Sequence, residues 1–205
     1  LFYNDLMPLN SRDHGKWRSR TTDKAKWLAG QHAVPLTVEE FPQAQRNFPI
    51  IFSASDTPVP LALMGMNEGV NVFMDDAGKF TQAVYLPAYI RRYPFMLAKL
   101  RPDTDELSLC FDPTSDAVGE FKKDGEALFD GDQPSENTKN ILKFCEDFEQ
   151  AGARTHHDAA EQVAAQPVAA QDVPVGAGRL GDDRGHVLVV VVERQPGGQQ
   201  RGAKR

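Results

Sequence analysis

The chain has 205 residues, of which 40% are hydrophobic and 25% charged, a composition typical of a globular protein with one ordinary core. The formal net charge of -6 gives no electrostatic footprint for nucleic acid or an anionic membrane, so we expect neither as a charge-driven partner. Cys110 and Cys145 are too few for a disulfide framework, and we expect two buried free thiols.

No secretory signal is visible at the start of the sequence. The most apolar run is residues 187–192, far shorter than the about 20 residues of a spanning helix. The sequence therefore predicts a cytoplasmic protein without a membrane-spanning segment.

The first part of the chain reads as short strands and helices in alternation. Residues 6–9 and 33–36 are apolar, and the second segment is a plausible strand. Thr37 and Glu40 match a capping box, which predicts a helix from residue 38 to about 46 with Pro42 in its first turns. The apolar run 48–52 that follows predicts a buried strand.

A turn at residues 56–60 is expected to lead into a three-strand meander over 61–66, 70–74 and 80–86. A helix should begin at Pro87, and residues 107–111 should form a further strand. Residues 137–150 predict an amphipathic helix with one apolar stripe, made of Ile141, Phe144, Cys145 and Phe148. The expected class is α+β, with a largely antiparallel sheet and a few short helices.

The composition changes near Gly152. Every Phe, Tyr and Trp lies at or before Phe148, and half of the glycines lie from Gly152 onward. The change has two explanations: a natural flexible tail that lacks the aromatics of a core, or a frameshift in a GC-rich gene, which we favour. We therefore divide the chain into a domain at 1–152 and a disordered tail at 153–205, and expect no tertiary contacts beyond about Arg154.

Residues 85–95 read Tyr-Leu-Pro-Ala-Tyr-Ile-Arg-Arg-Tyr-Pro-Phe, which resembles the signature segment of the bacterial SapC family. Further matching pieces occur in the family's order, at residues 6–9, 32–36, 40–41, 48–52 and 107–112. The resemblance covers residues 2–152, and because the family continues further, it implies a truncated domain. Family members carry labels as S-layer-associated proteins or peptide-transport permeases; the second label conflicts with the absence of a spanning segment.

Arg91 and Arg92 stand among aromatic residues and form the strongest candidate site. With Tyr89 and Tyr93 they could bind a carboxylate or phosphate through bidentate hydrogen bonds and stacking. In the alternative interpretation the tyrosines pack inward and the arginines make structural ion pairs. Only one arginine can share the tyrosine face, because adjacent helical residues diverge by about 100°.

Other polar residues carry weaker signals. His32 is included among the ligand-binding candidates, and an enzyme would combine it with Asp112 and Arg91 in one cleft. Asp112 precedes a proline and is typical of turn chemistry, and no histidine or cysteine spacing points to a metal. We therefore predict no catalytic residue, no metal and no cofactor.

The preferred hypothesis is a soluble binding or accessory protein for a small anionic ligand or a peptide. The alternatives are an enzyme of unknown chemistry and an S-layer-associated structural protein.

Overall fold

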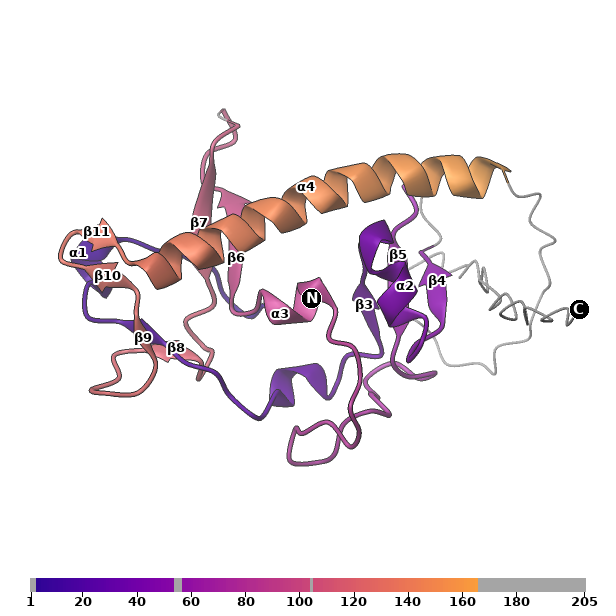
Figure 1. The fold of residues 1–205 in the computed structure, drawn as a ribbon, viewed down its shortest axis with the longest axis horizontal. Coiled ribbons are helices and arrows are strands. Elements are labelled where there is room, and N and C mark those ends of the chain that lie inside the picture. Colours follow the sequence, from indigo (N-terminus) through magenta and orange to yellow (C-terminus); the bar gives the residue numbers. More distant parts are fainter. Residues whose placement is uncertain (1–2, 54–56, 104, 166–205) are drawn as a thin grey trace, which may run out of the picture.

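One long helix, α4 (Glu136–Ala165), runs along the described part of the chain and crosses over its two main sheets (Figure 1). The computed structural model describes residues 3–53, 57–103 and 105–165, with side chains up to residue 156. Helix α4 contacts β6 (Phe95–Lys99) of one sheet and the 3-10 helix η2 (Val38–Glu40). Helix η2 comes shortly after the first strand of the other sheet. The amphipathic helix predicted at 137–150 is confirmed and is longer than expected.

The first sheet is antiparallel and has the strand order β1-β7-β6. Its outer strand β1 (Met7–Pro8) and the central strand β7 (Leu107–Phe111) fall at segments that the sequence marked as apolar. Strand β6 pairs along its whole length with β7, from Phe95 opposite Phe111 to Lys99 opposite Leu107. The sequence pattern predicts no strand over these residues. This sheet carries one of two core clusters, which includes Phe95, Phe111 and Cys145.

The second sheet has the strand order β3-β5-β4, with β3 at Ala33–Pro35, β5 at Pro60–Leu63 and β4 at Ile50–Phe52. The strands predicted at 33–36 and 48–52 are therefore confirmed in shorter form. The capping box at Thr37 and Glu40 is also present, and it begins η2, which continues into α2 (Phe41–Ala44) with Pro42 in the first turn. The second core cluster lies on this sheet.

The predicted three-strand meander is wrong. Only its first segment is a strand, and β5 pairs with β3 and β4 instead of with residues 70–74. The other two segments share a single bridge, between Met74 and Phe80. The buried Asn71 side chain accepts a hydrogen bond from the N–H of Phe73 and donates one to the carbonyl of Leu28, so it competes with a strand ladder. Val72 is consequently 64% exposed.

The remaining elements are short. Strand β2 (Arg18–Ser19) lies between β8 (Val118–Gly119) and β9 (Glu126–Ala127), and β10 (Phe129–Asp130) pairs with β11 (Gln133–Pro134). Gly125 beside β2 has φ +77°, and a Cβ there would lie 2.1 Å from the carbonyl oxygen of Ser19. The short helices are α1 (Ser11–His14), η1 (Lys26–Leu28) and α3 (Ala88–Arg91).

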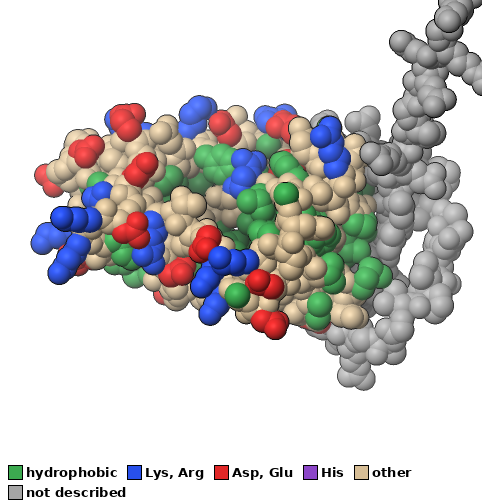
Figure 2. All heavy atoms as spheres, turned by 60° about the horizontal axis from the view of Figure 1, so that its bottom comes forward, with side chains coloured by type: hydrophobic (Ala, Val, Ile, Leu, Met, Phe, Trp, Pro, Cys, Tyr) green, Lys and Arg blue, Asp and Glu red, His purple; other side chains and the backbone are tan. Residues whose placement is uncertain are grey.

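The surface is charged at one end and more apolar toward the other. In Figure 2, lysine and arginine side chains gather with acidic ones at the end where β8 and β9 lie, and hydrophobic side chains are visible over the middle of the face. None of the described helices is long and apolar enough to cross a membrane. Together the helices and antiparallel sheets confirm the α+β class.

Helix α4 continues without a break past residue 152. Thr155 is buried, and its hydroxyl accepts a hydrogen bond of 3.0 Å from the N–H of Val38. Arg154 also pairs with Glu39. The expectation that tertiary contacts end at about Arg154 is therefore wrong at Thr155. The division of the chain at residue 152 stays a prediction, and most of the expected tail, residues 166–205, lies outside the described residues.

Candidate functional site

Helix α3 presents the two arginines, and a buried carboxylate holds its first turn in place. Glu40 Oε1 accepts hydrogen bonds from the N–H of Ala88, at 2.6 Å, and from the hydroxyl of Tyr85, at 2.9 Å. Pro87 is the N-cap, as its fixed φ favours, and Arg92 is the C-cap. Tyr89 and Arg92, three residues apart, therefore project on the same side of the turn.

Arg92 is buried between two aromatic rings. Its guanidinium carbon lies 4.4 Å from the ring centre of Tyr89 and 4.4 Å from that of Phe148 on α4. One nitrogen, Nη1, donates to Glu149 Oε1 at 3.0 Å. The Arg92 side chain is 5% exposed, and its Nε–H is buried without a hydrogen-bond partner. A cation thus lies against the second core cluster with one of its donors unpaired.

Arg91 has a different environment from its neighbour. Its side chain is exposed, its Nε donates to the carbonyl of Leu86 at 3.0 Å, and its guanidinium covers the ring of Phe144 at 5.2 Å. Only Arg92 therefore shares the face of Tyr89, as the helical geometry implies.

The tyrosines of the segment pack inward. Burial raises the pKa of Tyr89, and the nearby positive charge of Arg92 offsets part of that rise. The ring of Tyr93 lies 4.2 Å from Trp27 and 5.3 Å from Tyr3, centre to centre. Tyr93 is therefore part of an aromatic cluster, whereas Tyr89 faces the guanidinium.

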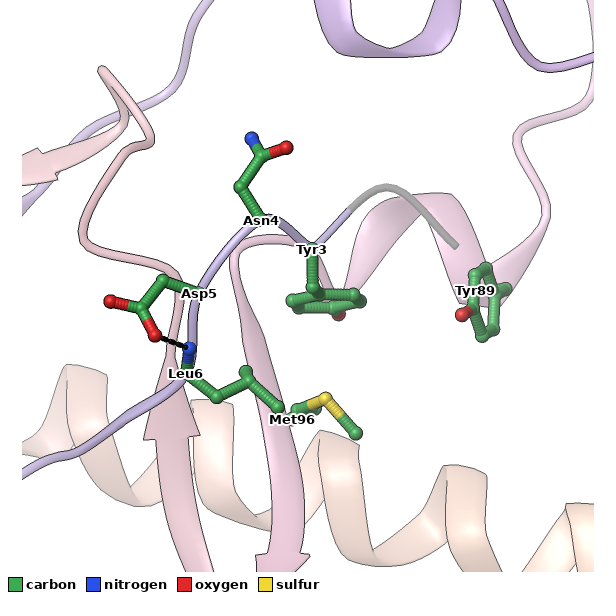
Figure 3. Close-up of a pocket in the computed structure, with 6 residues that line it drawn as sticks. All are labelled: Tyr3, Asn4, Asp5, Leu6, Tyr89 and Met96. Carbon is green, nitrogen blue, oxygen red and sulfur yellow. Dashed lines mark hydrogen bonds between the residues drawn. The ribbon is translucent and has the colours of Figure 1, made fainter.

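Two cavities adjoin this cluster. The larger, of about 480 Å³, lies under α4 and is lined by Arg92, Glu149 and Thr155 together with mostly apolar side chains, among them Leu36, Val59, Leu97 and Phe148. The smaller, of about 360 Å³, is lined by residues 3–6, Tyr89 and Met96 (Figure 3). Tyr89 and Met96 line both cavities, so the two spaces share a wall. Both volumes fall in the range of small-molecule sites, about 300–1,000 Å³.

None of the three residues of the proposed catalytic trio lines either cavity. His32 precedes β3, where its carbonyl accepts hydrogen bonds from Met64 and Gly65, and it lines neither cavity. Arg91 and Asp112 line neither cavity either. Both cysteines are buried free thiols, as predicted, and burial raises the pKa of Cys145 to about 11. Among the described residues no group of acidic, histidine or cysteine side chains could hold a metal.

Asp112 organises the N-terminal segment. Its carboxylate accepts hydrogen bonds from the N–H of Asn4 at 2.8 Å and from the N–H and hydroxyl of Thr114 at 2.9 and 2.6 Å. Burial alone would raise the pKa of this carboxyl, but the hydrogen bonds from Thr114, Asn4 and Asp5 outweigh it and hold the pKa below its ordinary value. Asp112 thereby fixes residues 4 and 5, which line the smaller cavity.

The lowered pKa of Asp112 predicts an acid-sensitive contribution to stability. It is fully present above the unfolded-state pKa of about 4 and is lost as the pH falls through the lower folded-state pKa. The Asp112→Asn variant should therefore lose more unfolding free energy at pH 7 than at pH 2.5, measured by urea denaturation. Asp116→Asn, at an exposed position nearby, is the control. An Asp112→Asn penalty that stays constant with pH would contradict this account.

Sequence reasoning missed Glu149 as a partner of Arg92. The two residues are 57 positions apart, so no local spacing connects them. Phe148 was expected only as part of an apolar stripe, and Met96 was not singled out. The sequence offered one signal for this contact: Glu149 directly follows Phe148, the last residue of the apolar stripe.

The fold and the cavities define an α+β protein with several small antiparallel sheets, a long helix that contacts β6 and η2, and a buried arginine packed against the second core cluster. The family model for SapC matches residues 9–171. The chain therefore belongs to the SapC family, and the match extends beyond residue 152, where we expected it to end. No curated protein and no solved structure matches the chain.

Proposed function

We propose that this protein binds a small anionic ligand, with Arg92 as the residue that recognises it. The observation that carries the proposal is the buried guanidinium of Arg92, which lines a cavity of about 480 Å³ and keeps one N–H unpaired. A buried N–H without a partner costs about 1–3 kcal/mol. An anion that draws the guanidinium into fuller hydrogen bonding would recover part of that cost.

The existing ion pair leaves Arg92 open to an external anion. Glu149 satisfies Nη1 alone, and its own side chain is 42% exposed, so it does not enclose the cation. The rings of Tyr89 and Phe148 hold the guanidinium plane in position. A preorganised, planar cation in partly apolar surroundings favours bidentate binding of a carboxylate or phosphate.

The proposal is narrower than the set of residues selected from the sequence. Arg92 and Tyr89 line the larger cavity and remain the proposed ligand-binding residues. Arg91, Tyr93 and His32 line neither of the two cavities, so we assign them no direct contact with the ligand.

The Arg92→Lys variant should bind small anions about 10–100-fold more weakly than the wild-type chain. Lysine keeps the charge but lacks the planar fork, and one hydrogen bond to a charged group is worth about 1.5–3 kcal/mol. Isothermal titration calorimetry of the full chain with phosphate, benzoate and octanoate measures the change.

Arg91→Lys is the matched control, since it makes the same change at the adjacent position outside the cavity. It should leave the affinity unchanged. A urea midpoint for Arg92→Lys close to that of the wild type would show that the variant is folded. Equal weakening by both variants, or no anion binding by the wild-type chain, would refute the proposal.

A further inference from the structure

We infer that the ligand of this site is an amphipathic monocarboxylate: one carboxylate group placed at Arg92 and an apolar group that extends along the shared wall of the two cavities. The inference rests on the proposed function and specifies its ligand class. It follows from the walls and the charge of the two cavities, and from the side chains that line both of them.

Apolar side chains line much of the space beside Arg92, together with the polar residues Thr37, Thr155 and His156. Leu36, Val59 and Leu97 line the larger cavity from three different strands or their ends. In the smaller cavity, Figure 3 shows the side chains of Leu6, Met96 and the two tyrosines around the space, whereas the amide of Asn4 and the carboxylate of Asp5 point away from it. Asp5 instead accepts a hydrogen bond from the N–H of Leu6. Such walls favour alkyl or aryl groups and leave a fully hydrated anion without partners.

The local charge selects a single negative charge. Arg92 is the one basic side chain among the residues lining the two cavities apart from His156, and Glu149 already neutralises it. A dianion would leave an excess of negative charge beside apolar walls, where charge is costly. A monocarboxylate can instead replace Glu149, whose half-exposed side chain can turn into solvent. The guanidinium then keeps one carboxylate partner.

The shared wall gives the ligand its length. Because Tyr89 and Met96 line the larger cavity together with Arg92, an apolar group that starts at Arg92 can lie along these two side chains. Affinity should therefore rise with alkyl length as further methylene groups leave water, by about three- to fourfold for each one buried.

The test measures binding to the full chain by calorimetry across acetate, butanoate, hexanoate and octanoate. We expect affinity to rise along the series, with octanol and inorganic phosphate both binding at least tenfold more weakly than octanoate. An N-acetylated leucine dipeptide with a free carboxyl terminus, compared with its amide, shows whether a peptide end can supply the same chemistry. Tighter binding of the dipeptide acid than of octanoate would identify a peptide source, and the reverse order a free alkyl carboxylate.

The Glu149→Gln variant should change the affinity in the direction opposite to that of Arg92→Lys. Removing the internal carboxylate should strengthen octanoate binding about fivefold, the worth of a partly exposed ion pair. Glu146→Gln, at an exposed position on the same helix, should leave it unchanged. Phosphate binding that depends on Arg92, with no dependence on alkyl length, would overturn this inference and leave the proposed function standing. Absence of binding by every anion would overturn both.

Discussion

Replacing Glu40 by alanine is expected to lower the free energy of unfolding by about 3–5 kcal/mol. Glu40 is 6% exposed, and its carboxylate accepts four hydrogen bonds. Two of the donors are the backbone N–H groups of Thr37 and Ala88. In the alanine variant these two groups lose the carboxylate that accepts their hydrogen bonds. Each buried donor left unpaired costs about 1–3 kcal/mol, and Tyr85 loses its partner as well.

Glu39→Ala provides the control at the preceding position. Glu39 forms an exposed ion pair with Arg154, and such pairs contribute about 0–1 kcal/mol. Urea denaturation of both variants, followed by circular dichroism, measures the difference. Equal losses of stability would contradict the role of Glu40. The result also bears on the site, because Glu40 anchors the turn that presents Tyr89 and Arg92.

Local patterns predicted the elements whose determinants lie close together in sequence. The capping box requires only Thr37 and Glu40, three positions apart, and it is present. The apolar runs at β4 and β7 identify strands without reference to their partners. Helical geometry likewise separated Arg91 from Arg92, because two adjacent residues cannot face the same tyrosine.

The errors arose where distant contacts decide the structure. Residues 70–74 have strand-forming side chains, but the buried amide of Asn71 bonds to Leu28, 43 positions away, and bends the chain. Strand β6 directly follows the turn that contains Arg92, and no local signal in residues 85–95 marks where the turn ends and the strand begins. Asp112 was interpreted correctly as turn chemistry through Thr114, yet its bond to Asn4 spans 108 positions.

Composition was an incomplete guide to where packing ends. The loss of aromatic residues after Phe148 suggested a boundary at residue 152. Thr155 nevertheless contacts the domain, because its hydroxyl alone is enough to accept a hydrogen bond from Val38 in η2. Its hydroxyl also donates to the carbonyl of Ala151, as a threonine inside a helix commonly does. A single polar contact of this kind leaves no hydrophobic signal in the sequence.

Phe111→Ala is expected to destabilise the chain by about 3–5 kcal/mol, the usual cost of removing a fully buried phenylalanine. Phe111 is completely buried at the end of the central strand β7, where it is paired with both Met7 and Phe95. Its ring centre lies 5.0 Å from that of His14 and 5.3 Å from that of Trp17, so truncation leaves a void beside these two rings.

The matched control for this prediction is Leu107→Ala at the other end of β7. Leu107 is largely exposed, so its truncation should cost less than about 1 kcal/mol although it lies in the same strand. Phe111→Leu fills part of the void, so its loss of unfolding free energy should lie between those of the two alanine variants. It can be compared with Leu107→Ala even if Phe111→Ala does not fold. Chemical denaturation orders the three variants. A Phe111→Ala loss no greater than that of Leu107→Ala would show that the first sheet does not depend on this ring, and that β1 and β6 are held to β7 mainly by their backbone hydrogen bonds.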